Sequence, residues 1–88
     1  MEKSIFTPNY GAFRAYLVAM RKAAGLTQRQ LAERLKRTRT VVERIEAGQR
    51  RIDVFELYWI AKACGIKAEK VFADVVKQLK TSDRPQRR

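Results

Sequence analysis

Lysine and arginine dominate the side chains of this chain that could take part in chemistry. The 88 residues include 20 Lys and Arg against nine Asp and Glu, which gives a formal net charge of +11. Charge of this size does not determine a fold, but it constrains the partners. It favours nucleic acid, an anionic membrane surface or an acidic protein.

Side chains that commonly act in catalysis or hold metals are scarce. The chain has no His, which removes the commonest general base and any Ser/His or Cys/His pair. With Cys64 as the single cysteine, neither a zinc site nor an internal disulfide is expected. We interpret Cys64 as a small core residue rather than a reactive thiol. The sequence therefore predicts a protein that is not an enzyme and uses no metal or cofactor.

The length and the distribution of apolar residues predict one small domain. No apolar run approaches the roughly 20 residues that span a bilayer, and the N-terminal segment lacks the apolar stretch of a secretion signal. The lone cysteine fits a reducing compartment, so we expect a cytoplasmic protein. We expect a flexible arm over residues 1–6, the domain over 7–80 and a disordered basic tail over 81–88.

The stretch TQRQLAERLKRTRTVVERIEAG, residues 27–48, reads as two short helices with a tight turn between them. Thr27 and Thr38 are N-cap candidates, since a threonine hydroxyl can accept a bond from a backbone N–H at a helix start. Helical spacing gives each segment its own buried edge, and Gly48 can end the second helix in the left-handed conformation. Two helices joined in this way form a helix-turn-helix, whose second helix can lie in the DNA major groove.

Three further helices complete an all-α chain in which no strand pattern or internal repeat occurs. Thr7-Pro8 starts the first, with Phe13, Leu17, Met20 and Ala24 as its apolar stripe, and Leu26 is expected to be buried beside it. Asp53 and Glu56 resemble a capping box at the start of the fourth. Ile52 precedes it as an apolar anchor. The five helices are expected at about 8–24, 28–35, 39–47, 54–64 and 68–80.

This pattern resembles the phage repressor/Cro-type (XRE-like) helix-turn-helix family, whose fold is the five-helix lambda-repressor-like DNA-binding domain. The family pattern matches Gln28, Ala32, Val42 and the run Ile45-Glu46-x-Gly48. The turn departs from it, because Lys36 and Arg37 stand where the family has Gly and an apolar residue. A non-glycine residue at positive φ costs about 1 kcal/mol, so we expect a reshaped turn.

The resemblance places base-reading residues at the start and on the outer face of the second helix of the motif. Arg can bridge O6 and N7 of guanine, Thr can contact a thymine methyl or a base edge, and Glu can accept from cytosine N4. Val41 has no evident core role and is expected to contact a thymine methyl. The alternative is that these are ordinary solvated residues. The base-reading set is Thr38, Arg39, Thr40, Glu43 and Arg44.

Basic residues around the motif are expected to bind phosphates. Between Thr27 and Arg51 there are eight Lys and Arg against three Asp and Glu, although such charges can also serve only solubility. Gln28 opens a helix, where free N–H groups attract an anion. The phosphate set is Gln28, Arg29, Lys36, Arg37, Arg50 and Arg51. The resemblance further implies a partly buried ion pair between Arg21 and Glu46, which would fix the angle of the reading helix.

Surplus apolar residues on the last two helices predict a homodimer interface. Leu57, Ile60, Ala61 and Cys64 can serve the core, and Tyr58 can join them. An exposed apolar patch usually marks an interface, although both helices could instead pack entirely into the core. The interface set is Phe55, Trp59, Phe72, Val75, Val76 and Leu79.

The function that follows is a sequence-specific transcriptional regulator. We expect a dimeric repressor whose two reading helices, about 34 Å apart, bind double-stranded DNA at a palindromic operator. A protein-interaction module such as an antitoxin or anti-activator, with a protein partner, is the alternative. A third reading is non-specific nucleic-acid binding driven by charge, which would be steep in salt and indifferent to sequence.

Overall fold

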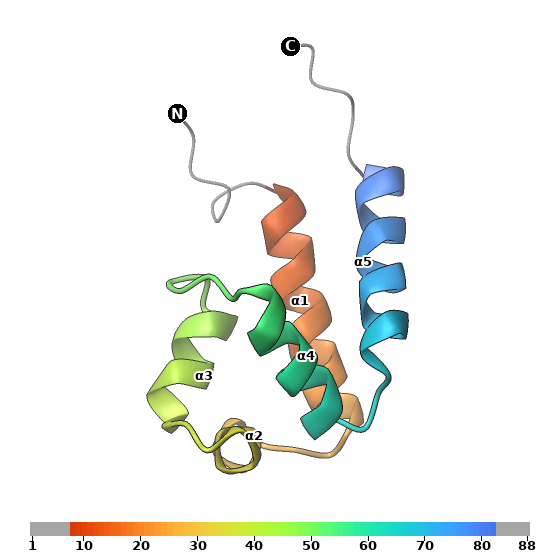
Figure 1. Ribbon diagram of the computed structural model, residues 1–88. Helices are drawn as coiled ribbons and strands as arrows, with labels where there is room; N and C mark the ends of the chain where they lie inside the picture. The colour runs from red at the N-terminus through yellow and green to blue at the C-terminus, as the bar shows by residue number, and fades with distance from the viewer. Residues whose placement is uncertain (1–7, 83–88) are drawn as a thin grey trace.

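Five helices make up the computed structural model, which describes residues 8–82 (Figure 1). The prediction of an all-α chain of five helices is confirmed, and each expected boundary lies within two residues of the observed one. No strand occurs among residues 8–82. The helices are α1 (Pro8–Ala23), α2 (Gln28–Leu35), α3 (Arg39–Glu46), α4 (Val54–Ala63) and α5 (Ala68–Ser82).

Side-chain caps define where two of the helices begin. At α2, Thr27 Oγ1 accepts a bond from the backbone N–H of Gln30 at 3.0 Å, and the Gln30 side chain accepts from the N–H of Thr27 at 2.9 Å. Asp53 and Glu56 form the same reciprocal capping box at α4. Each box satisfies two backbone donors that a helix start otherwise leaves free, so these boundaries are set locally.

All five helices contribute to one apolar core. In Figure 1, α1 and α4 lie in the middle, with α5 on one side and the pair α2 and α3 on the other. Val71 is the fully buried anchor of α5, and Cys64 is buried as expected. The core residues are Leu17, Met20, Leu26, Leu31, Ala32, Val42, Ile45, Ile60, Ala61, Cys64 and Val71.

Three expectations about the core and the helix ends are wrong. Ala24 follows the end of α1 and is exposed, because the apolar stripe stops one turn earlier at Met20. Tyr58 remains 45% exposed, since α4 turns Leu57, Ile60 and Ala61 toward the core instead. Helix α5 continues through Ser82, past the point at which we expected the tail to begin.

The expected N-cap at Thr7, the arm over residues 1–6 and the tail from residue 83 onward lie outside the described residues. Within the described part of the chain, no helix combines the length and the apolar character that crossing a membrane requires.

Candidate nucleic-acid interface

The turn between α2 and α3 keeps a left-handed residue even though it lacks glycine. Lys36 has φ 57° and ψ 42°, and it ends α2 with its N–H directed at the carbonyls of Ala32 and Glu33. The N–H of Arg37 bonds to the carbonyl of Ala32 at 2.9 Å and closes the turn. The expectation of a reshaped turn is therefore wrong: Lys36 adopts the strained conformation, at a cost of about 1 kcal/mol.

Helix α3 separates cleanly into a buried and an outward face. Val42 and Ile45 are buried against the core, whereas Arg39, Thr40 and Arg44 are exposed. The 3.6-residue period places Thr40 and Arg44 on the opposite side of the helix from the two apolar residues, and Arg39 at the edge of that outer face. The structure thus brings the expected base-reading residues together on one exposed surface.

Val41 differs from its expected role, and Glu43 has an ion-pair partner on the same helix. Val41 is half-buried and packs against the core, so it does not project outward toward a thymine methyl. Glu43 lies 3.3 Å from Arg39 in an ion pair one helical turn apart. Both side chains are about half-exposed, so the pair is weak and DNA can compete for either partner.

Thr38 stands at the N-cap position of α3 without capping it. Its backbone is extended, as an N-cap requires, but its hydroxyl makes no bond to the helix start. The expected side-chain cap is therefore wrong. The consequence is an exposed hydroxyl beside the first N–H groups of α3, where a phosphate or a base edge can bind both.

A network of charged bonds fixes the C-terminal end of α3 against α1. Arg21 Nε lies 2.7 Å from Glu46 Oε2, and both side chains are about nine-tenths buried. A second guanidinium nitrogen of Arg21 donates to the other carboxylate oxygen at 3.0 Å, and a third donates to the carbonyl of Leu26. The bonds to Glu46 raise the pKa of Arg21. This is the pairing that the resemblance implied.

Arg14 adds a second contact between α1 and the end of α3. Its guanidinium donates to the backbone carbonyl of Glu46 at 2.9 Å. The side chain also covers Gly48, where an added Cβ would lie only 2.8 Å from Arg14 Nε. Gly48 has φ 79°, so both its conformation and its contact with Arg14 favour glycine.

The expected phosphate-binding residues divide into exposed and engaged groups. Arg29, Lys36, Arg37 and Arg51 are exposed around α2, the turn and the loop after α3. Gln28 differs, because its side-chain amide donates to Glu46 Oε1 at 2.9 Å. Only the backbone N–H groups at the start of α2 therefore remain for the anion expected near Gln28.

Glu56 of α4 connects the turn to the loop that follows α3. Its carboxylate lies 2.6 Å from Arg50 and 3.7 Å from Arg37. The bond from Arg50 is the main cause that lowers the pKa of Glu56, so the carboxylate stays charged well below neutral pH. Arg50 is consequently half-buried and already paired, which makes Arg51 the more accessible cation of the loop.

The apolar residues expected at a dimer interface occupy two different sides of α4. Phe72, Val75 and Leu79 line a groove with Leu57, between α5 and the N-terminal half of α1. Trp59 lies instead beside Leu35 of α2 and Val41 of α3. Phe55 is exposed and Val76 is half-buried, and neither lines the groove.

Sequence reasoning missed three features of this surface. Ala47 is exposed just past the end of α3, and helical spacing would have placed it on the outer face with Thr40 and Arg44. The T-x-x-Q pattern at Thr27 and Gln30 is a capping-box signature that the sequence displays. The contact of Arg14 with Gly48 has no local signal, since it depends on how α1 crosses the end of α3.

A helix-turn-helix of the DNA-binding class is formed by α2, the turn at Lys36 and α3, which has an exposed outward face. A family model described as a helix-turn-helix domain matches residues 12–71. Among solved structures, an XRE-family like protein from Pseudomonas syringae pv. tomato str. DC3000 is similar, with a TM-score of 0.74 and 32% sequence identity. That match covers 78% of this chain and 84% of the other. A comparison with curated proteins gave no match.

The chain belongs to the XRE family of helix-turn-helix DNA-binding proteins, which are not enzymes.

Proposed function

We propose that this protein is a sequence-specific transcriptional regulator whose helix α3 reads base pairs in the major groove. The observation that carries this proposal is the outward face of α3, where Arg39, Thr40 and Arg44 are exposed within a helix-turn-helix. Arginine and threonine on such a face match the donors and acceptors of base edges. Arg29, Lys36, Arg37 and Arg51 lie around it and supply phosphate contacts.

The test is selection of binding sites from a pool of random duplex DNA, followed by affinity measurements at fixed salt. We expect one enriched sequence that binds at least about 1,000-fold more tightly than random DNA. Equal affinity for selected and random duplexes, with a steep dependence on salt, would instead identify charge-driven binding without sequence recognition.

A pair of substitutions separates base reading from phosphate binding. Arg44→Ala should relax the preference at one base position by about 1–3 kcal/mol, because one base contact is lost. Arg51→Ala should weaken selected and random DNA about equally, because phosphates carry no sequence information. The measurement is a competition assay with every single-base variant of the selected site. If the two variants behave alike, α3 does not read bases.

We infer that the protein acts as a homodimer joined through the groove between α1 and α5. The groove holds about 290 Å³ and is lined by uncharged residues: Asn9, Tyr10, Phe13, Leu57, Phe72, Val75 and Leu79. Phe72 is 59% exposed, which is unusual for an aromatic residue beside an apolar groove. An uncharged contact also lets two strongly basic copies meet without placing like charges in the interface.

Dimerisation would give the operator its symmetry. Two copies related by a two-fold axis present two α3 helices, which match half-sites about one helical turn apart. A dimer on a promoter occupies base pairs that the polymerase needs, so we propose repression at a palindromic operator. Transcription in vitro from a promoter that carries the selected site tests the sign of regulation.

Sedimentation velocity tests the interface with two matched phenylalanines. Phe72→Glu should convert the dimer to a monomer, because it buries a charge in the apolar groove. Phe55→Glu should leave the dimer intact, since Phe55 is 76% exposed and does not line the groove. A dimer that survives Phe72→Glu, or that is lost with Phe55→Glu alone, would place the interface elsewhere.

A protein-interaction module, such as an antitoxin or anti-activator, is the second candidate. Phe55, Tyr58 and Trp59 favour it, because they are exposed aromatic residues outside the groove. In the selection experiment, such a module would yield no enriched sequence.

A further inference from the structure

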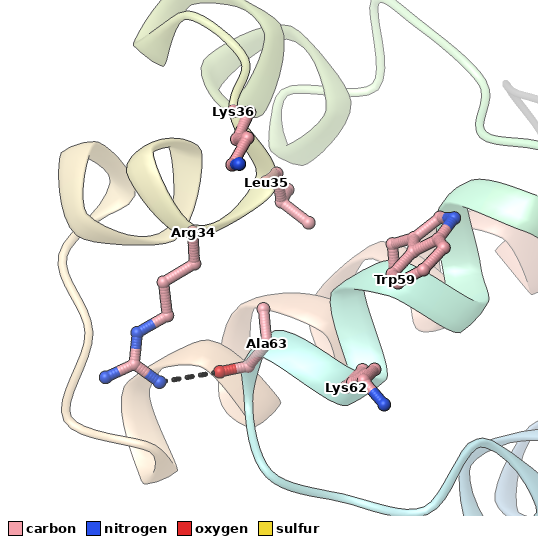
Figure 2. A pocket seen from close by; sticks show the side chains of 6 residues that line it. All are labelled: Arg34, Leu35, Lys36, Trp59, Lys62 and Ala63. Carbon is pink, nitrogen blue, oxygen red and sulfur yellow. Dashed lines mark hydrogen bonds between the residues drawn. The ribbon is translucent and has the colours of Figure 1, made fainter.

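Trp59 projects from α4 into a hollow outside the proposed dimer groove, and Lys36 is the one residue that this hollow shares with the proposed phosphate-binding set. It is the only tryptophan in the sequence, and its side chain is 54% exposed. The hollow, of about 300 Å³, lies between α4 and the end of α2, and Leu35 and Ala63 also line it (Figure 2). A second, adjoining hollow continues past Trp59 and Leu35 to Val41 and Ile45, and the ion pair of Arg37 and Glu56 also lines it. The indole thus stands in an open, mainly apolar depression.

Three cations surround the first of these two hollows. Arg34, Lys36 and Lys62 line it together with Trp59, and no carboxylate lines this first hollow. Within the described part of the chain, none of the three has a salt-bridge partner. Arg34 donates to the carbonyl of Ala63 at 2.8 Å, which ties this guanidinium to the end of α4 beside the hollow (Figure 2). The position therefore combines an accessible aromatic ring with three uncompensated positive charges.

The geometry points to a docking site for an acidic segment of a partner protein, with one apolar side chain packed on Trp59. An apolar side chain can cover the indole and Leu35 while carboxylates on either side meet the three cations. Phosphates of DNA would meet the same cations but leave the indole uncovered. A second copy of this chain would bring its own excess of positive charge to a positive rim.

The site lies beside the helix-turn-helix rather than on its reading face. Lys36 belongs to the turn between α2 and α3, whereas Arg39, Thr40 and Arg44 project from α3. A partner in the hollow can therefore be held next to the DNA while α3 remains in the groove. Such a role goes beyond DNA binding, and the titration that tests it contains DNA only as a separate control.

The experiment is a titration with a 12-residue peptide of alternating Glu and Asp around one central Leu. Binding is measured from the fluorescence of Trp59. Because Trp59 is the only tryptophan, any change in emission reports on this site. We expect a saturable change in emission with the acidic peptide. It should be lost when the acids are replaced by Gln or the central Leu by Ser.

Two charge reversals of equal size show whether the cations around the hollow contribute to peptide binding. Lys62→Glu should weaken peptide binding by about fivefold or more, because it opposes the peptide charge at the hollow. Lys22→Glu changes the net charge equally, but Lys22 is an exposed residue of α1 that does not line the hollow. The Lys22→Glu variant should bind the peptide as tightly as the unmodified protein. Trp59→Ala should bind the peptide weakly, and because this variant has no tryptophan its binding is measured from the anisotropy of a labelled peptide. Circular dichroism verifies that each variant is folded.

Four results would overturn the proposal. The first is no saturable response to the acidic peptide, and the second is equal weakening by Lys62→Glu and Lys22→Glu. The third is a change in emission with a random 20-base-pair duplex that depends on Lys62, which would assign the site to nucleic acid. The fourth is a change in emission on raising the protein concentration alone, which would assign it to a second copy.

Discussion

Thr27 and Thr38 are two threonines at the same position relative to a helix start, yet they do different things. Thr27 forms both bonds of a capping box, whereas the hydroxyl of Thr38 bonds to no part of α3. Both precede short helices whose first N–H groups need acceptors. We therefore expect Thr27 to serve stability, and we propose that the hydroxyl of Thr38 is available to bind DNA.

Alanine substitutions at these two threonines should therefore have opposite effects on stability and on DNA binding. Thr27→Ala should destabilise the protein by about 1 kcal/mol, because the cap bond is lost. The melting temperature should fall by about 4–8 °C. Thr38→Ala should leave the melting temperature nearly unchanged but weaken binding to the selected DNA. Thermal unfolding and DNA titration of both variants measure this, and a large loss of stability in Thr38→Ala would contradict it.

At the same scale, helical periodicity predicted the outward position of Thr40 and Arg44, since it places them opposite Val42 and Ile45. Arg39 lies at the edge of that face and is exposed at the first position of α3. Periodicity did not predict the partial burial of Val41. Val41 lines the same hollow as Trp59 and Leu35, so its surroundings depend on how α4 packs against α2. Local spacing contains no information about that packing.

At the level of helices, contacts between α1 and α3 hold the C-terminal end of α3 in place. Arg21 reaches the side chain of Glu46, and Arg14 reaches its backbone carbonyl. Gln28 of α2 donates to the same carboxylate. Side chains of α1 and α2 therefore meet at one acidic residue of α3.

Breaking this ion pair should be costly from either side. Glu46→Gln leaves Arg21 without its charged partner, and Arg21→Met leaves Glu46 in the same situation. Each should destabilise the protein by about 3–5 kcal/mol, because a buried charge loses its counterion. The melting temperature should fall by more than about 12 °C.

The double variant Arg21→Met with Glu46→Gln tests the origin of this effect. It should be less destabilised than the sum of the single variants, since neither charge then remains alone. Thermal unfolding of all three variants gives the comparison. Unchanged melting temperatures in both single variants would show that the pair does not contribute to stability.

The helix boundaries could be predicted because their causes are local. Capping residues at Thr27 and Asp53, and a glycine after α3, fix three ends without reference to the rest of the chain. The turn was not predicted correctly, because a preference for glycine at Lys36 is worth only about 1 kcal/mol. Packing of α2 against α3 exceeds that preference and holds Lys36 in the left-handed conformation.

For the whole molecule, the attachment of α5 to α1 depends on a polar contact as well as on Val71. The Tyr16 hydroxyl donates to Asp74 Oδ2 at 2.7 Å, across 58 residues of sequence. Burial, and then the bond to Asp74, raise the pKa of Tyr16 to about 12. The bonds from Tyr16 and Lys70 lower the pKa of Asp74. The contact is therefore formed by a neutral phenol and an ionised carboxylate.

Stability should depend on pH in a way that reports this contact. The pKa of Tyr16 is raised on folding, so its contribution is fully present below pH 10, its ordinary pKa, and is lost as the pH rises toward about 12. The pKa of Asp74 is lowered on folding. Its contribution to stability is therefore present at neutral pH and is lost as the pH falls below the usual range of an aspartate pKa.

Urea unfolding at pH 8, 10 and 11.5 measures the alkaline loss. The unmodified protein and the control Tyr58→Phe should lose more stability than Tyr16→Phe, which has no phenol at this position. Tyr58 is a suitable control because it is exposed and lies on α4. Equal losses in all three proteins would show that the bond between Tyr16 and Asp74 does not form in solution.

The separation of Trp59 from the groove lined by Phe72 and Leu79 also depends on the arrangement of the whole molecule. The sequence shows only that α4 and α5 carry more apolar residues than one core needs. Which of those residues share a surface depends on how α4 lies between α2 and α5, and that follows from the packing of all five helices.

The position of Arg14 over Gly48 has a consequence for how this sequence can vary. The two residues lie 34 positions apart, yet a side chain at position 48 would occupy the space that the guanidinium fills. Arg14 would then have to move and release the last carbonyl of α3, which would alter the geometry of the reading helix. A larger residue at position 48 would therefore carry two costs, the left-handed backbone and the displaced guanidinium, and a shorter residue at position 14 would relieve only the second.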